Sequence, residues 1–258
     1  GVEDETISYG APDDSESHAS TLDEIVLIGR EKQLAELAAA KKEFLVSLQP
    51  SVVFIRGRSG EGKTSLVEKF LHPLRRDNRV LVLSGRCYDR ESVPFKAIDC
   101  IIDALVPHLR SRRADEINEL LPADTPMLAQ LFPVLRRVQT IAERATLDIS
   151  GLDGRQVRIR AFAALRELLR TFSQTTPLVI FIDDLQWGDA DSAGGLRDLL
   201  TPTDAPRVLL LGSYRSDEAE DSPFLKAWRA SQPLCREQLI EVSALTEQDA
   251  LSMLASRV

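Results

Sequence analysis

The segment 57–64 contains the residues whose types and spacing most directly predict chemistry. It reads Gly-Arg-Ser-Gly-Glu-Gly-Lys-Thr, which fits the pattern of a glycine, four variable residues and then Gly-Lys-Thr. The glycines would let consecutive backbone N–H groups turn inward toward phosphate oxygens, and the positive end of a helix opening at Thr64 would face the same oxygens. Lys63 is then expected to reach the β and γ phosphates, and the Thr64 hydroxyl to bind Mg²⁺. The alternative is a glycine-rich turn that matches the pattern by chance.

The flanks of this segment favour a phosphate loop over a chance match. An apolar run over 51–56 precedes it and a helical pattern over 64–74 follows it, which is the context that the motif requires. We therefore expect a nucleotide to bind here together with Mg²⁺. The residues expected to contact it are Gly57, Ser59, Gly60, Glu61, Gly62, Lys63, Thr64 and Ser65.

Two acidic residues follow a second apolar run, over 178–182. Open sheets of parallel strands bind ligands at the carboxyl ends of the strands, so Asp183 and Asp184 are expected beside the phosphate loop. Asp183 is suited to hold Mg²⁺ together with the Thr64 hydroxyl, and Asp184 to orient or deprotonate the attacking water. The alternative is a turn in which these carboxylates only end the strand.

A third apolar run, over 208–212, leads to Ser213 and Arg215. The planar guanidinium of an arginine at this edge could bind the γ phosphate and lose that contact on hydrolysis, so it would act both as a sensor and as a stabiliser of charge. The alternative is a surface arginine that pairs with Asp217 or Glu218.

The elements that must position these groups alternate along the chain. Apolar or β-branched runs over 51–56, 79–84, 178–183, 207–213 and 238–242 predict strands, and helical spacing predicts helices over 64–74, 95–110, 157–172, 192–200 and 224–231. Strands separated by helices predict a three-layer α/β/α fold around a five-stranded, mainly parallel sheet. The continuous apolar runs 178–183 and 208–212 should be central strands, because helices cover both of their faces. Three prolines in the leucine-rich segment 114–138 predict short helices on one side of the sheet.

The charge of the chain is uneven along its length. The 258 residues contain 40 acids and 32 bases, a net charge of −8, yet eight of the acids lie in residues 1–24, where no Lys or Arg occurs. This leaves equal numbers of acids and bases elsewhere, which argues against a basic surface for nucleic acid. Residues 1–24 are predicted to be a disordered acidic tail or linker.

Two other features of the sequence bear on the cellular location of the protein. No apolar run approaches the roughly 18 residues of a membrane span, so no membrane partner is expected. The three cysteines have no metal-ligand spacing and no disulfide pattern, which favours a reducing, cytoplasmic location.

Four motifs in a fixed order resemble one known family. They are residues 26–34 (Val-Leu-Ile-Gly-Arg-Glu-Lys-Gln-Leu), the phosphate loop, residues 181–189 (Phe-Ile-Asp-Asp-Leu-Gln-Trp-Gly-Asp) and residues 212–215 (Gly-Ser-Tyr-Arg). Together they resemble the AAA-type ATPase module of the STAND signalling ATPases, in the bacterial subgroup fused to serine/threonine protein kinases or transcriptional regulators. The resemblance covers about residues 25–258.

This resemblance implies a switch that binds ATP or ADP and resets by slow, Mg²⁺-dependent ATP hydrolysis. Gly29 and Arg30 match the segment that lies against adenine and ribose, Asp183 matches the metal acid, Arg215 the sensor and Asp184 the catalytic acid. Fast hydrolases of this type usually carry glutamate at the last of these positions, so the shorter aspartate implies slow turnover. The implied partners are other domains of a longer parent chain, such as a protein kinase or a DNA-binding regulator, and further copies of the module in a nucleotide-dependent self-association.

The same resemblance divides the chain into an ATPase core over 25–244 and the first helix of a truncated helical lid over 245–258. Two other functions remain open. One is a DNA-associated loader or origin-recognition ATPase, although the balanced charge gives no reason to expect that this fragment binds nucleic acid directly. The other is a small-molecule phosphotransferase whose acceptor site would come from the segment 114–138.

Overall fold

The computed structural model describes residues 28–89, 94–146 and 151–249. The predicted acidic tail over 1–24 therefore lies outside the described residues. Of the helix predicted over 245–258, residues 247–249 are helical, and its remainder from residue 250 lies outside the description as well.

The core is a five-stranded sheet in which every neighbouring pair of strands is parallel. The strands are β1 (Ser51–Gly57), β2 (Leu81–Arg86), β3 (Leu178–Asp183), β4 (Val208–Arg215) and β5 (Arg236–Glu241). Their order across the sheet is β2-β3-β4-β1-β5, so β4 lies between the strand of the phosphate loop and the strand of the acids. The predicted parallel sheet and its central strands β3 and β4 are confirmed.

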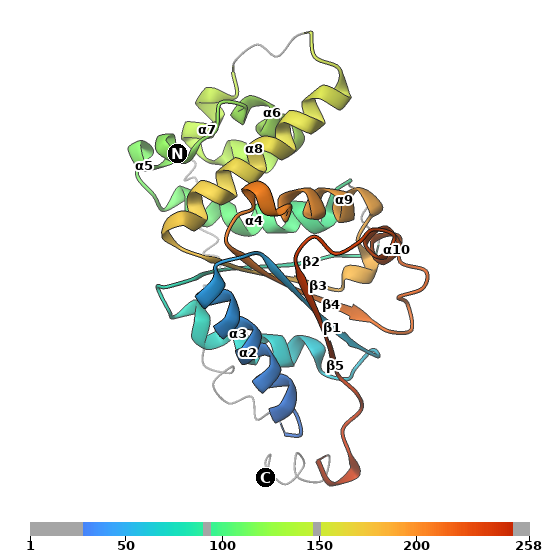
Figure 1. Cartoon of the computed structure of the whole chain (residues 1–258). Helices are drawn as coiled ribbons and strands as arrows, with labels where there is room; N and C mark the ends of the chain where they lie inside the picture. The colour runs from blue at the N-terminus through green and yellow to red at the C-terminus, as the bar shows by residue number, and fades with distance from the viewer. Residues whose placement is uncertain (1–27, 90–93, 147–150, 250–258) are drawn as a thin grey trace, which may run out of the picture.

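Helices cover both faces of the sheet, as Figure 1 shows. On one face lie α2 (Glu31–Ser47) and α3 (Lys63–Arg75), and on the other lie α4 (Lys96–Arg110), α8 (Gly154–Thr175), α9 (Ala190–Leu199) and α10 (Pro223–Arg229). Successive strand side chains point to opposite faces, so Val53 and Ile55 of β1 join the first layer of core, and Val52 and Phe54 join the second. This is the predicted three-layer arrangement.

The segment 114–138 and its continuation form short helices on the α4 and α8 side, as predicted (Figure 1). They are α5 (Ala114–Leu120), α6 (Thr125–Leu131), a 3₁₀ helix (Pro133–Arg137) and α7 (Gln139–Arg144), and a further 3₁₀ turn over Pro202–Asp204 precedes β4. Three aromatic rings join this layer to the core, since Phe95, Phe132 and Phe162 pack edge to face at 5.1–6.3 Å between centroids.

Helix α2 was not among the predicted elements. Apolar side chains occur on its exposed side as well, as Leu45 and Val46 show, and only Leu37 and Phe44 are fully buried against the sheet. The apolar residues therefore give no clear helical period. Among the described helices, none is both long enough and apolar enough to cross a membrane.

Two adjacent glycines in α9 differ sharply in what surrounds them. A Cβ atom on Gly195 would lie 2.4 Å from the Phe162 ring of α8 and 2.7 Å from Ile98 of α4, because the three helices meet there. A Cβ atom on Gly194 would meet nothing within 4 Å. Gly195 thus sets how closely α9 approaches its neighbours, while Gly194 is exposed.

We expect opposite effects on stability from the same substitution at these two sites. Gly195→Ala should lower the free energy of unfolding by about 1–3 kcal/mol, since the methyl group forces the helices apart. Gly194→Ala should raise it by about 0.5–1 kcal/mol, since alanine loses less backbone entropy in a helix. Urea unfolding of both variants measures the difference, and equal effects would contradict the packing described for α9.

Candidate active site

The carboxyl ends of four strands meet at one edge of the sheet. In the register of the sheet, Gly57 at the end of β1 lies opposite Arg215 at the end of β4, and Arg86 at the end of β2 lies opposite Asp183 at the end of β3. Residues from distant parts of the chain are therefore brought together because parallel strands all end on the same side. The phosphate loop, both acids and Arg215 lie at this edge, as predicted.

The phosphate loop runs from β1 into α3 through two left-handed residues. Gly60 and Gly62 have φ angles of 81° and 86°, which glycine adopts without steric cost. The carboxylate of Glu61 accepts a hydrogen bond from the backbone N–H of Arg58 and so holds the loop closed. Helix α3 begins at Lys63, immediately after the second of these glycines.

Lys63 is buried beneath this loop. Its ammonium donates to the carbonyl oxygens of Gly57 at 3.0 Å and Arg58 at 2.8 Å. Burial lowers the pKa of Lys63 below its ordinary value, and the nearby carboxylates of Asp184 and Asp183 oppose that effect. The side chain is thus a buried cation at the base of the loop, where phosphate charge would be compensated.

Thr64 and Asp183, the two residues expected to hold Mg²⁺, lie in direct contact. The Thr64 hydroxyl donates to Asp183 Oδ2 at 2.9 Å, although the two residues are 119 positions apart. Ser213, which is fully buried in β4 between them, donates to the other oxygen of Asp183. A hydroxyl and a carboxylate with few further protein ligands fit Mg²⁺, which keeps several waters and prefers hard oxygen donors.

Asp184 is buried in a network of donors. Arg86 donates from Nε at 2.8 Å and from Nη2 at 2.5 Å to Asp184 Oδ2, and Gln186 Nε2 donates to Oδ1 at 2.9 Å. Burial alone would raise the pKa of Asp184, but the hydrogen bonds from Gln186 and Arg86 outweigh it and lower the pKa below the ordinary value. The carboxylate is therefore held ionised.

Arg215 contacts acids on both sides. It pairs with Glu218 at 2.9 Å, as the alternative interpretation of a surface arginine predicted, but its Nε also lies 3.6 Å from Asp184 Oδ1. Its guanidinium lies 5.9 Å from the centroid of the Trp187 ring, which is half-buried against the core. Arg215 therefore lies next to the predicted catalytic acid and keeps a second partner in Glu218.

A cavity of about 770 Å³ opens beside the phosphate loop. Its lining includes six of the predicted nucleotide-contacting residues: Arg30, Ser59, Gly60, Glu61, Gly62 and Ser65. Ile28 and Leu245 add apolar surface, which suits a flat base. Arg30 is 5% exposed and donates to the carbonyl oxygens of Glu61 at 3.0 Å and Ser243 at 2.6 Å, so it ties the segment before α2 to both walls. Gly29 approaches Asp249 so closely that a Cβ atom would lie 2.6 Å from its carboxylate.

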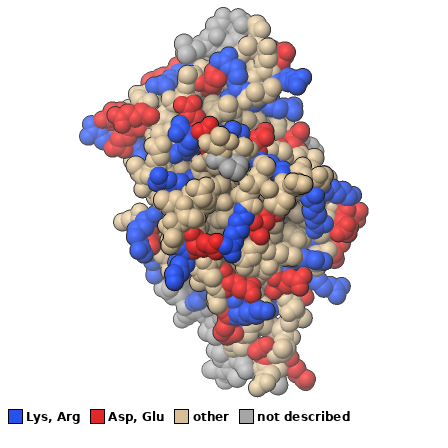
Figure 2. All heavy atoms as spheres, in the orientation of Figure 1, with Lys and Arg blue, Asp and Glu red and all other residues tan. Residues whose placement is uncertain are grey.

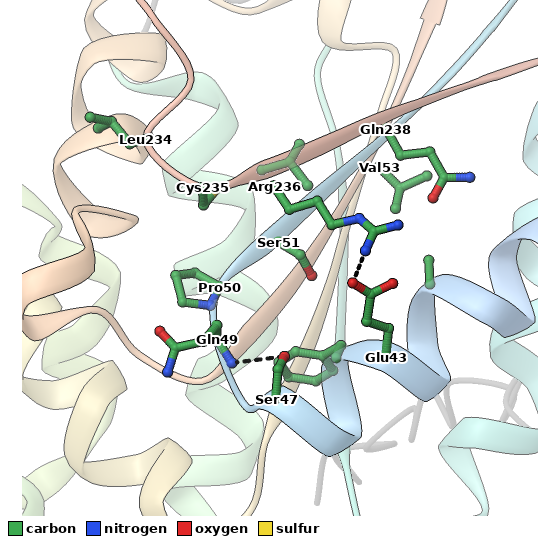
Figure 3. Close-up of a pocket in the computed structure, with 13 residues that line it drawn as sticks. Glu43, Ser47, Gln49, Pro50, Ser51, Val53, Leu234, Cys235, Arg236 and Gln238 are labelled. Carbon is green, nitrogen blue, oxygen red and sulfur yellow. Dashed lines mark hydrogen bonds and ion pairs between the residues drawn. The ribbon is translucent and has the colours of Figure 1, made fainter.

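A second cavity, of about 260 Å³, lies at the opposite end of the sheet (Figure 3). Helix α2 and the first residues of β1 and β5 line it, and an ion pair between Glu43 and Arg236 crosses its mouth. None of the predicted site residues lines this cavity. We regard it as the junction of α2 with the edge strand β5 rather than as part of the site.

Two residues of the acid network were not predicted, namely Arg86 and Gln186. Arg86 follows a predicted strand and could have been found by asking which side chains end the strand next to Asp183. Gln186 gave a weaker signal, since only its place two residues after Asp184 points to the site. Its contacts depend on the 3₁₀ turn Leu185–Trp187, which sequence patterns do not reveal.

Comparisons with known proteins agree with this geometry. The family described as AAA ATPase domain matches residues 26–211, which include the phosphate loop and both acids. Among solved structures, Cdc6p from Pyrobaculum aerophilum is 15% identical, with a TM-score of 0.51, and the match covers 92% of this chain and 52% of that one. The Aeropyrum pernix Orc1 protein in complex with DNA is 18% identical, with a TM-score of 0.49 and coverages of 93% and 52%. No curated protein gave a match.

The chain spans about half the length of these solved proteins, and at such identities the likeness concerns the fold alone. The family match is broader evidence, because it covers well over half of the chain and contains the residues that the geometry brings together. The chain therefore belongs to the AAA ATPase domain family, whose members hydrolyse ATP.

Proposed function

We propose that this domain is a signalling switch that binds ATP or ADP with Mg²⁺ and resets by slow hydrolysis. The observation that carries the proposal is the network around Asp184. This acid, which follows the candidate metal ligand Asp183 in sequence, is held by Arg86 and faces Arg215. A domain built for rapid turnover would need that carboxylate free to act on water. Here it is neutralised by a cation in an arrangement that a bound nucleotide can change.

The first part of the proposal, nucleotide binding, uses the phosphate loop and its neighbours. Lys63 and the loop N–H groups would hold the β and γ phosphates, and Thr64 with Asp183 would hold Mg²⁺. Gly29 and Arg30 would border the base and ribose in the adjoining cavity, where Arg30 already fixes two walls. Mg²⁺, when bound, would neutralise charge that develops on the phosphate oxygens.

The second part, hydrolysis, uses Asp184 as the group that orients the attacking water. An ion-paired carboxylate with a lowered pKa is a weak base, so the contact with Arg86 must loosen before Asp184 can accept a proton. This requirement supports slow turnover. It adds to the effect of the aspartate side chain, which reaches less far than a glutamate.

The third part, switching, uses Arg215. Its partners Glu218 and Asp184 are both carboxylates, and a γ phosphate at the loop would compete with them for the guanidinium. The position of Arg215 would then report whether ATP or ADP is bound. We propose that this change is passed to other domains of a parent chain, such as a protein kinase or a DNA-binding regulator, or to a second copy of the domain.

Direct action on DNA is less well supported. A DNA-binding surface gathers Lys and Arg into a stripe, whereas on the face in Figure 2 they are interspersed with Asp and Glu. The likeness to DNA-associated proteins is a likeness of fold, which many functions share. The described cysteines, Cys87, Cys100 and Cys235, are free thiols, in keeping with the cytoplasmic location that we propose.

The phosphate-loop assignment predicts a thermal shift. ADP with Mg²⁺ at about one hundred times its dissociation constant should raise the melting temperature by about 5–10 °C, because it binds only the folded protein. Lys63→Ala should remove most of that shift. Lys96→Ala, outside the loop, should retain it. An undiminished shift in the Lys63 variant would exclude the proposed phosphate site.

The role of Asp184 predicts a loss of hydrolysis without a loss of binding. Asp184→Asn should reduce kcat for ATP by about 10²–10⁴-fold, since the amide cannot accept a proton from water. Nucleotide affinity, measured with a fluorescent ADP analogue, should stay within about threefold of the unmodified domain. Asp115→Asn, on α5, is the matched control. Full activity in Asp184→Asn would rule out this residue as the catalytic acid.

The sensor role predicts that the domain distinguishes its two nucleotides. Calorimetric titration should give dissociation constants for ADP and a non-hydrolysable ATP analogue that differ by about tenfold or more, because only a difference in affinity can shift a conformational equilibrium. Arg215→Ala should bring the ratio close to one. Arg229→Ala, which removes another Arg–Glu pair, should leave it unchanged. Equal affinities in the unmodified domain would contradict a switch.

A further inference from the structure

A buried amide lies between the catalytic acid and the sensor of the proposed function. Gln186 is 2% exposed and belongs to the 3₁₀ turn Leu185–Trp187 that follows β3. Burying an amide side chain costs free energy unless its polar atoms have hydrogen-bond partners, and Gln186 has a partner at each end of its amide. Packing alone would be served as well by an apolar side chain of the same length.

Gln186 makes one hydrogen bond toward each of the two groups. Its Nε2 donates to Asp184 Oδ1 at 2.9 Å, and its Oε1 accepts from the backbone N–H of Arg215 at 3.1 Å. The orientation of the amide is fixed by chemistry, because a backbone N–H can only donate and an ionised carboxylate can only accept. Turning the amide over would break both bonds at once.

Hydrogen bonds from Arg86 and Gln186 hold the Asp184 carboxylate in one orientation. Arg86 donates to Asp184 Oδ2, and Arg215 Nε lies 3.6 Å from Oδ1, beyond hydrogen-bond distance. Gln186 is therefore the side chain that donates a hydrogen bond to Oδ1. The same side chain joins the end of β3 to the end of β4, since Asp184 follows β3 and Arg215 ends β4. A displacement of the Arg215 backbone is therefore transmitted to the acid through two short contacts.

We propose that Gln186 is a positioning residue that couples the orientation of Asp184 to the position of Arg215. The inference rests on the proposed function, in which Asp184 orients the attacking water and Arg215 senses the γ phosphate. In this role Gln186 would act through the acid and not on the water or the nucleotide. It makes the acid respond to the strand that carries the sensor.

The test uses two substitutions that distinguish the two hydrogen bonds of Gln186. Gln186→Met keeps the length of the side chain and removes both hydrogen bonds. Gln186→Glu keeps an oxygen for the Arg215 N–H but loses the donor toward Asp184. The matched control is Gln139→Met on α7, because Gln139 also donates to a carboxylate, that of Glu143 at 3.0 Å, on an exposed surface.

A positioning role predicts a change in kcat that is separate from binding. Both Gln186 variants should lower kcat for ATP by about 10- to 100-fold, with KM and the affinity for ADP within about threefold, because a misplaced acid affects only the chemical step. The control should match the unmodified domain. A kcat unchanged in both variants would overturn the proposal, and so would loss of ADP binding in both, since that shows a purely structural role.

A double-mutant cycle identifies the group through which Gln186 acts. In the Asp184→Asn background, Gln186→Met should cause no further fall in kcat, because the acid that it positions is already gone. A further fall of tenfold or more would overturn the coupling. The cycle also separates the two claims: if Asp184→Asn alone keeps full activity, the proposed function fails, whereas an inactive Asp184→Asn beside fully active Gln186 variants refutes this inference only.

Discussion

The hydrogen bond from Thr64 to Asp183 is the contact on which the rest of the site depends. It joins the first turn of α3 to the end of β3. The bond has to pass across the end of β4, because β4 lies between β3 and β1, the strand that leads into α3. The crossing is possible because Ser213 is the residue of β4 at that point. Its small, fully buried hydroxyl leaves room and itself donates to Asp183. A larger side chain there would separate the loop from the acid.

The charges at this edge must be considered together. Lys63, Arg86 and Arg215 face Asp183 and Asp184, and each of the two acids is largely withdrawn from water. Buried charges are tolerated when they are paired and hydrogen-bonded. Removing one partner leaves the other as an uncompensated buried charge, which destabilises the folded state. In the function that we propose, a nucleotide with Mg²⁺ would add several negative charges and a cation to this set. The pairing of the arginines would then change, which is the physical basis of the proposed switch.

Much of this arrangement could be predicted from the sequence, and for one reason. Parallel strands end at a common edge, so a phosphate loop, two acids and an arginine that each follow an apolar run are placed near one another without knowledge of any contact. What could not be predicted were contacts that depend on the exact path of the chain. To predict the contact of Arg86 with Asp184, one must know that β2 is the neighbour of β3. To predict the contacts of Gln186, one must know the 3₁₀ turn that follows Asp184. Helix α2 was missed because two buried side chains in seventeen residues give almost no period.

The backbone at Asp184 gives a reason for an aspartate at this position, where the family resemblance led us to expect glutamate in a fast hydrolase. Asp184 has φ 55° and ψ 44°, in the left-handed region, where aspartate and asparagine occur far more often than other residues with a side chain. Its N–H donates to the Ser213 hydroxyl at 3.3 Å, so the turn is held in this form by the same residue that supports Asp183. Glutamate has no comparable preference for this conformation. The left-handed turn therefore favours the shorter acid at position 184, and the same turn places Gln186 between Asp184 and Arg215.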